Sequence, residues 1–211
     1  MGEHGLPRAT LVRLAKGSLL HRVHPAGFAG DAFNSNRLGN ARFSPLSDPA
    51  GEVIPTIYAG STLNCVLMET IFHDVPYAPG FKPVSRDRLA GSRHSILKTK
   101  TSLSLIDLRS IALRKLGVER SRLIDTPKSQ YPDARAWALV LYSRYPKAQG
   151  LQWTSRQDDS AVAYVLWGTR IPSGTLAAQA PALRLDEGAA WLAVLNLADR
   201  IGALLVDPRQ S

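Results

Sequence analysis

The segment that most constrains the fold of this chain is residues 54–74, IPTIYAGSTLNCVLMETIFHD. A β-branched run stops at a Gly-Ser pair, and an apolar segment with helical spacing follows. We therefore expect a strand at 52–60 and a helix at 62–73 that is capped by Ser61. One carboxylate, Glu69, stands among the apolar residues of that helix. A charge in such a place is costly unless it is paired or has a function, so Glu69 is the first candidate functional residue.

The remaining segments predict strands and helices in mixed order. Strand-like pieces lie at 19–24, 95–108, 150–155, 161–169 and 203–206, and helical segments lie at 109–116, 131–146 and 185–202. No internal repeat or obvious linker interrupts this pattern. The sequence therefore predicts a single α+β domain over residues 19–211.

Two stretches have less regular patterns. Residues 1–18 predict a flexible N-terminus, and residues 25–51, rich in Gly, Asn, Ser and Pro, predict a long loop. Loops of that length in compact domains are usually functional or mobile. In the helix at 131–146, we expect Ala136, Leu139, Val140 and Tyr142 or Ser143 to face inward.

Composition limits the class of protein. No apolar run approaches the roughly 18 residues needed to span a membrane, and the N-terminal residues lack the pattern of a secretory signal. The only cysteine, Cys65, lies in the apolar helical segment, which excludes an intrachain disulfide and predicts a buried, inert thiol. These features favour a cytoplasmic protein.

The chain carries a net charge of +9 and has a sequence pI of about 10.0, which indicates an anionic partner or substrate. The basic residues are nevertheless scattered as singles and pairs, without a run of five and without interleaved aromatic residues. Single-strand binding proteins use such interleaving. The charge pattern therefore disfavours direct binding of nucleic acid.

Several familiar catalytic and binding motifs are absent from the sequence. It contains no P-loop, no GxGxxG after a strand, no HExxH, no CxxC and no GxSxG. The five histidines are spread along the chain, so we expect no metal site.

The helical neighbours of Glu69 are Cys65, Val66, Phe72 and His73, of which three are apolar. An ion pair with His73 or with an arginine would explain this carboxylate without any catalytic role. The sequence by itself leaves that explanation open.

Three other residues suggest one class of substrate when they are combined with Glu69. Tyr58 lies near the end of the preceding strand, Arg42 lies in the polar loop, and Arg22 lies in the first strand. Arginine clamps phosphate, tyrosine offers a flat face to a planar base, and a carboxylate stabilises a cationic sugar. A dinucleotide with a ribose–pyridinium bond would use all of them, although Arg22 and Tyr58 also have ordinary structural explanations.

Four segments in order resemble the RES-domain family, the toxin halves of bacterial RES–Xre toxin–antitoxin pairs. These segments are LLHRVH with a later FN, then ARFSP, PTIYAGSTLNCVLMETIFHD and GLQWTSRQDD. The resemblance extends from about residue 19 to about residue 170. It implies a split, mixed β-core similar to that of ADP-ribosyltransferase toxins, with helices around a dinucleotide cleft.

The resemblance also implies an activity and partners. The activity is degradation of NAD⁺ by hydrolysis or by phosphorolysis, with NAD⁺ as the substrate, inorganic phosphate as co-substrate in the second case, and no resident cofactor. The implied partner is an Xre-like antitoxin. A homodimer is compatible with the sequence and is not visible in it.

The family's functional residues can be placed on this chain. They fall on Arg22, Arg42, Tyr58, Glu69 and Ser155. Trp153 stands where the family often has tyrosine, and Arg156 follows the serine in a supporting role.

Under this resemblance, the catalytic set is Glu69, Arg42 and Tyr58. The nicotinamide leaves readily because it is already a pyridinium, so the barrier lies in the oxocarbenium-like sugar, which the carboxylate would stabilise. Arg22, Ser155 and Arg156 form the substrate-binding set, in which the serine bonds the substrate or orients Arg22 or Glu69.

Two alternatives remain at the level of the sequence. One is ADP-ribosyl transfer to a protein, which the related fold would permit, although METIF holds a single glutamate and no ExE pair. The other is a basic module that binds nucleic acid, and this alternative depends on the net charge alone.

Overall fold

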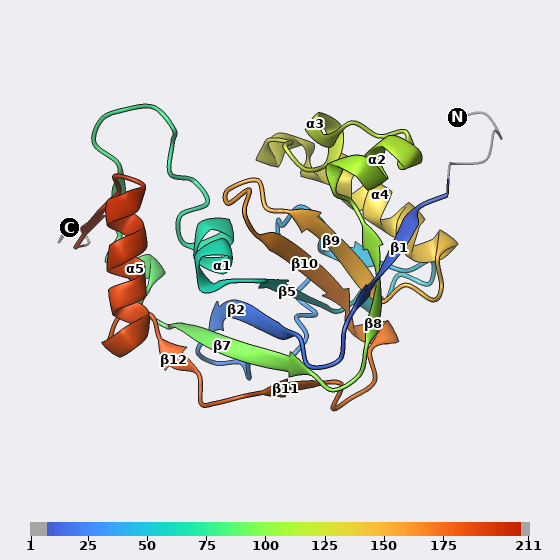
Figure 1. Ribbon diagram of the computed structural model, residues 1–211, viewed down its shortest axis with the longest axis horizontal. Coiled ribbons are helices and arrows are strands. Elements are labelled where there is room, and N and C mark those ends of the chain that lie inside the picture. The colour runs from blue at the N-terminus through green and yellow to red at the C-terminus, as the bar shows by residue number, and fades with distance from the viewer. Residues whose placement is uncertain (1–7, 208–211) are drawn as a thin grey trace.

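A nine-stranded mixed sheet forms the centre of the protein (Figure 1). The computed structural model describes residues 8–207. Within that range the main path of the sheet is β1-β8-β9-β10-β5-β2-β7-β11, and β12 also pairs with β7. Neighbouring strands are antiparallel except β8 and β9, which run parallel.

The strands of this sheet are β1 (Thr10–Leu14), β2 (Leu19–Pro25), β5 (Thr56–Gly60), β7 (Ser92–Thr99), β8 (Leu103–Asp107), β9 (Gly150–Thr154), β10 (Val162–Trp167), β11 (Leu176–Ala178) and β12 (Leu183–Arg184). Two small sheets pair β3 (Leu46–Ser47) with β4 (Val53–Ile54), and β6 (Pro83–Ser85) with β13 (Leu204–Val206). The α-helices are α1 (Leu63–Thr70), α2 (Ser110–Leu116), α3 (Arg120–Leu123), α4 (Tyr131–Arg144) and α5 (Gly188–Arg200). Three 3₁₀ turns are η1 (Arg86–Arg88), η2 (Lys128–Gln130) and η3 (Gly168–Arg170).

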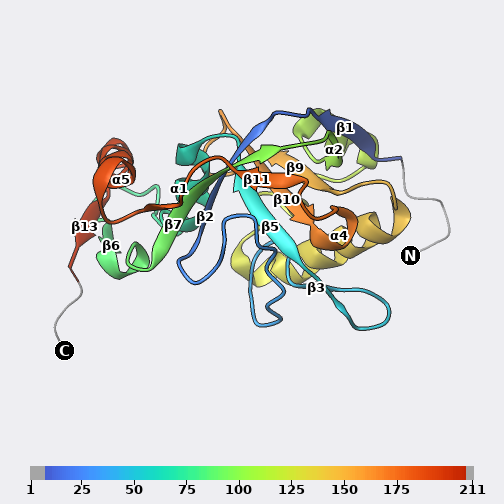
Figure 2. The same ribbon diagram turned by 90° about the horizontal axis from the view of Figure 1, so that it is seen from below.

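The main sheet divides between β5 and β2. These two strands pair at one position, His21 with Gly60, whereas β2 pairs with β7 along its whole length. Helices α2 to α4 lie beside β8 and β9, and α1 and α5 lie toward the β2–β7 half (Figures 1 and 2). The predicted α+β class with a split, mixed β-core is confirmed.

The interior consists of three groups of buried apolar residues. One lies between the sheet and α4 and includes Phe43, Trp153 and Trp167, whereas the opposite face of the sheet carries a second group around Leu97. The third group joins α1 to α5 and includes Phe72. Helix α1 is therefore fixed from two sides, by the sheet and by α5.

The junction from β5 to α1 requires a residue without a side chain. A Cβ built on Gly60 would lie 2.9 Å from both Cys65 Sγ and Val66 Cγ1. The helix begins after Thr62, whose hydroxyl accepts a hydrogen bond from the Cys65 amide at 3.0 Å. The prediction that Ser61 caps this helix was wrong, because its hydroxyl accepts instead from the Val162 amide of the neighbouring strand.

Most of the other expected elements are present with shifted ends. The strand predicted at 52–60 is interrupted at Pro55, and the helix predicted at 62–73 ends at Thr70. The predicted loop at 25–51 is largely irregular and contains the short strand β3. Cys65 is fully buried as predicted, and burial raises the pKa of its thiol to about 12.

The prediction of a flexible N-terminus was wrong for residues 10–14. They form β1, which pairs with β8 in an unbroken register from Thr10 with Asp107 to Leu14 with Leu103. A strand at the edge of a sheet is half exposed and short, so its own pattern is weak and the pairing partner decides it. Residues 1–7 of the predicted segment lie outside the described residues.

The inward face of helix α4 was predicted only in part. Leu139 and Tyr142 are partly buried against the core as expected, whereas Ala136 and Val140 are exposed. The fully buried residues of the helix include Ala134, Ala138 and Leu141. Apolar residues occur all around this helix, so their spacing does not select a face. The short elements β6, β11, β12 and α3 were not predicted, because each is too short to show a period.

Within residues 8–207, no helix has the length and apolar character needed to cross a membrane.

Candidate active site

A pocket of about 350 Å³ lies where the two halves of the sheet separate. Its wall comes from β2, β5, α1, β9, β10, the loop before β3 and the start of α4. The lining residues are Val23, Asn40, Ala41, Arg42, Tyr58, Ala59, Val66, Glu69, Thr70, His73, Asp74, Lys128, Tyr131, Trp153 and Ala163. Such a volume lies toward the lower end of the range of about 300–1,000 Å³ for small-molecule sites.

Glu69 is held in this pocket by a buried serine. The Ser155 hydroxyl donates a hydrogen bond of 2.6 Å to Glu69 Oε1, although the two residues are 86 positions apart in the chain. Ser155 is fully buried and does not line the pocket itself. Of the roles expected for this serine, the structure supports the orientation of Glu69.

The turn between β9 and β10 fixes the serine hydroxyl. Its oxygen accepts hydrogen bonds from the backbone amides of Gln157 and Asp158, both at 3.1 Å. Because a hydroxyl has one hydrogen to donate, these contacts leave that hydrogen for Glu69. A neutral hydroxyl therefore positions the Glu69 carboxylate, and this hydrogen bond does not neutralise its negative charge.

Arg42 lies in the same pocket and is 5% exposed. Its guanidinium donates to Thr126 Oγ1 at 2.8 Å and lies 5.0 Å from the centre of the Tyr131 ring. Burial lowers the pKa of this guanidinium, and the nearby Tyr131 and Glu69 oppose that effect. The cation therefore lies close enough to Glu69 to share a substrate with it.

Tyr58 forms part of the pocket wall. Its hydroxyl accepts a hydrogen bond of 2.9 Å from the Phe43 amide, and its ring lies edge-on to Trp153 with centroids 6.4 Å apart. Burial raises the pKa of this phenol to about 12, so it stays protonated at neutral pH. Trp153, which stands where a tyrosine was expected, is buried and lines the pocket.

The structure places Arg22 away from the pocket. Alternate residues of a strand point to opposite faces, and the next residue along β2, Val23, is the one that lines the cavity. Arg22 is buried and donates to the carbonyls of Gly30 and Ala32 at 2.6 and 2.7 Å. It thereby holds the loop that follows β2, and burial lowers its pKa to about 10.

Arg156 lies at the margin of the site. It donates to the Thr126 carbonyl at 3.0 Å, and Arg42 contacts that same carbonyl at 3.4 Å. Arg156 is not among the residues that line the pocket. Of the six residues predicted for the site, Arg42, Tyr58 and Glu69 line the pocket. Ser155 contacts Glu69 without lining the pocket, and Arg156 shares the Thr126 carbonyl with Arg42.

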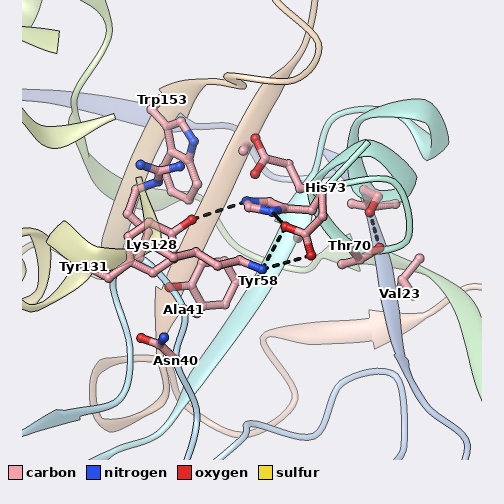
Figure 3. Close-up of a pocket in the computed structure, with 15 residues that line it drawn as sticks. Val23, Asn40, Ala41, Tyr58, Thr70, His73, Lys128, Tyr131 and Trp153 are labelled. Atoms are coloured by element: carbon pink, nitrogen blue, oxygen red, sulfur yellow. Dashed lines mark hydrogen bonds and ion pairs between the residues drawn. The ribbon is translucent and has the colours of Figure 1, made fainter. Parts of the chain in front are cut away.

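Four of the lining residues that were not predicted for the site form one connected group. The Tyr131 hydroxyl contacts His73 Nε2 at 3.2 Å, His73 Nδ1 contacts Asp74 at 2.8 Å, and Lys128 Nζ lies 2.8 Å from Asp74 (Figure 3). Hydrogen bonds from Lys128 and His73 lower the pKa of the Asp74 carboxyl to about 2. The four-residue spacing of His73 from Glu69 was a usable signal, whereas nothing local marked Lys128 or Tyr131.

No group of three or more His, Cys, Asp or Glu residues between residues 8 and 207 is arranged to hold a metal ion.

Comparison with known proteins adds a family and a fold. The model of the RES domain matches residues 19–187. No curated protein sequence matches the chain significantly. Among solved structures, one chain in the crystal structure of the M. tuberculosis MbcT–MbcA toxin–antitoxin complex has a similar fold, with a TM-score of 0.57 and 16% identity over 80% of this chain and 84% of that chain. Because the family match covers most of the chain and every residue that lines the pocket, this protein belongs to the RES-domain family.

Proposed function

We propose that this protein is the toxin of a bacterial toxin–antitoxin pair and that it degrades NAD⁺ by cleaving the bond between nicotinamide and ribose. The observation that carries the proposal is the Glu69 carboxylate, which lines the pocket and is oriented by the buried Ser155. Membership of the RES-domain family and the fold likeness to a toxin–antitoxin complex support the same conclusion.

The chemistry of the bond fits a carboxylate held by a neutral partner. Nicotinamide departs with the electron pair of the breaking C–N bond and becomes neutral, so it needs no general acid. Positive charge then develops on the ribose, and a fixed negative group stabilises that transition state more than the ground state. Glu69 would supply this charge, and Tyr58 would form the wall against the nicotinamide ring.

The cationic side of the pocket suits the phosphates of the substrate. Arg42 and Lys128 line the cavity, and Arg156 contacts the same Thr126 carbonyl as Arg42. Guanidinium groups bind phosphate oxygens in bidentate fashion. NAD⁺ is the substrate in this proposal, and the carboxylate chemistry requires no resident cofactor.

The decisive experiment is NAD⁺ turnover by the purified protein, with and without inorganic phosphate. We expect nicotinamide release that falls by about 10²–10³-fold or more in Glu69→Gln, because the substitution removes the stabilising charge and keeps the shape. Glu52→Gln is the matched control, since Glu52 is exposed in a turn outside the pocket. ADP-ribose as product would identify hydrolysis, and a phosphorylated ADP-ribose would identify phosphorolysis.

Absence of nicotinamide release from folded protein would overturn the proposal. Release that requires an added protein and labels that protein would point instead to ADP-ribosyl transfer.

The proposed partner is an Xre-like antitoxin that covers the pocket. A net charge of +9 would favour rapid association with a more acidic surface. In the cytoplasm, where NAD⁺ is abundant, expression of the wild type without this partner should lower cellular NAD⁺ and stop growth. Expression of Glu69→Gln should be tolerated.

A further inference from the structure

Two segments that are distant in the chain meet at the edge of the pocket. His73 and Asp74 follow the end of α1, and Lys128 and Tyr131 lie in η2 and at the start of α4 (Figure 3). The Tyr131 hydroxyl lies 3.2 Å from His73 Nε2, and His73 Nδ1 lies 2.8 Å from Asp74 Oδ1. All four residues line the same cavity as Glu69.

The partners of His73 determine where its hydrogen lies. The carboxylate of Asp74 only accepts hydrogen bonds, so Nδ1 of the neutral imidazole must carry the hydrogen. Nε2 then has a free electron pair and accepts the hydrogen of the Tyr131 hydroxyl. The lone pairs of the Tyr131 oxygen remain available to a molecule in the pocket.

Other charges fix this arrangement from several elements. Lys128 of η2 lies 2.8 Å from Asp74, and Arg88 of η1 lies 3.6 Å from it. The Arg42 guanidinium lies 5.0 Å from the centre of the Tyr131 ring. Glu69, one helical turn before His73, is the other charged group that lines the cavity on the side of α1.

We propose that Asp74, His73 and Tyr131 form a proton relay that accepts the proton of the water molecule attacking the ribose, so that the site performs hydrolysis. This inference rests on the proposed function and identifies water as the molecule that accepts the ADP-ribosyl group. Tyr131 would contact the water, whereas His73 and Asp74 act through Tyr131 as positioning and proton-accepting residues.

The oxygen of water forms a bond to C1′ of the ribose cation and loses one proton to the Tyr131 oxygen. As that O–H bond forms, the original hydrogen of Tyr131 passes to His73 Nε2. The imidazolium that results is stabilised by the Asp74 carboxylate, and the proton later leaves to solvent.

The relay distinguishes water from phosphate as the acceptor. Neutral water must lose a proton when it attacks, and a positioned base accelerates such a step by about 10²–10⁴-fold. Phosphate at neutral pH already carries oxygens without a proton, and it attacks without this help. Loss of the relay should therefore reduce hydrolysis and leave phosphorolysis, if it occurs, much less affected.

The test compares Tyr131→Phe and His73→Asn with the wild type in phosphate-free buffer. We expect both substitutions to lower kcat for ADP-ribose formation by about 10²-fold, with a smaller change in KM. Because both residues serve one relay, the double variant should be no slower than the slower single variant. Tyr142→Phe is the matched control, since the Tyr142 hydroxyl bonds Thr169 outside the pocket.

A solvent isotope effect separates the relay from a purely structural role. The wild-type kcat for hydrolysis should be lower in D₂O, because protons move during the attack by water, and His73→Asn should show a smaller effect because the second proton transfer is lost. Full hydrolysis by both single variants, multiplicative losses in the double variant, or an isotope effect unchanged in His73→Asn would overturn the relay alone.

The product distribution separates the remaining outcomes. Nicotinamide release by the wild type only in the presence of phosphate would leave the proposed function standing and overturn the relay. No release in any buffer would overturn the proposed function, and the relay would fall with it.

Discussion

At the scale of single residues, the contact between Ser155 and Glu69 carries the proposed chemistry. An ion pair would hold the carboxylate equally well, but it would cancel the charge that the sugar cation needs. A neutral hydroxyl, itself fixed by two backbone amides at 3.1 Å, orients the group and leaves that charge in place. The serine thus contributes through geometry and without direct access to the pocket.

Substitution of Ser155 by alanine should lower both activity and stability. The Glu69 carboxylate would lose its donor, and the amides of Gln157 and Asp158 would lose their acceptor in a buried turn. We expect turnover to fall by at least about 10-fold and the free energy of unfolding to fall by about 1–3 kcal/mol. Steady-state kinetics and urea unfolding would measure the two effects.

Ser160→Ala is the control for this substitution. Ser160 lies in the same turn and is exposed, and its amide and hydroxyl both donate to Asp158 Oδ1. Equal behaviour of the two alanine variants would argue against a special role for Ser155.

At the scale of secondary structure, the junction between β5 and α1 positions the site. Tyr58 lies in the strand, Glu69 lies in the helix, and Gly60 joins the two elements. Because a side chain at Gly60 would meet Cys65 and Val66 at 2.9 Å, the helix packs as closely as the backbone permits. The separation of Tyr58 from Glu69 therefore depends on this one glycine.

The substitution Gly60→Ala should displace α1 from the strand. We expect it to lower the free energy of unfolding by about 1–3 kcal/mol, as for other overpacked sites, and to lower kcat because Glu69 moves with the helix. Gly27→Ala provides the control, since a Cβ at Gly27 meets no atom within 4 Å. Unchanged stability and turnover in Gly60→Ala would show that the helix can shift without cost.

At the scale of the whole molecule, three histidines lie together in one half of the sheet. The half that contains β2 and β7 holds His21, His24 and His94, and the rings of His21 and His94 are stacked with centroids 5.2 Å apart. His94 is 4% exposed, and burial lowers its pKa to about 4. Burial also lowers the pKa values of His21 and His24.

Global stability should therefore fall in mild acid. The unfolded chain takes up a proton on His94 near its ordinary pKa of 6.5, whereas the folded protein does so only near about 4. The unfolded state binds more protons in that window, so the free energy of unfolding decreases as the pH falls through it. The difference for His94 alone corresponds to on the order of 3 kcal/mol.

Urea unfolding at about pH 7 and about pH 5.5 would measure the onset of this effect, in a window that lies above the ordinary pKa values of Asp and Glu, about 3.9 and 4.3. His94→Gln keeps a hydrogen-bonding group for His21 and removes the titrating ring, so it should flatten the dependence. A wild-type stability that is constant across the window would contradict the prediction.

Patterns within about twenty residues determined much of this protein. Residues 54–74 predicted that β5 is followed by α1, that Cys65 is buried and that Glu69 is the one carboxylate among apolar residues. They could do so because strand alternation, helical spacing and the cost of an unpaired charge act locally. The order of the motifs was sufficient to indicate the family.

The tertiary structure alone decided which distant residues meet. It brings Ser155 to Glu69 and Tyr131 to His73, and it turns Arg22 away from the pocket toward the loop after β2. It also makes an edge strand of residues 10–14. These outcomes depend on which strands become neighbours, and that choice minimises the free energy of burial and hydrogen bonding over the whole chain, which no short segment encodes by itself.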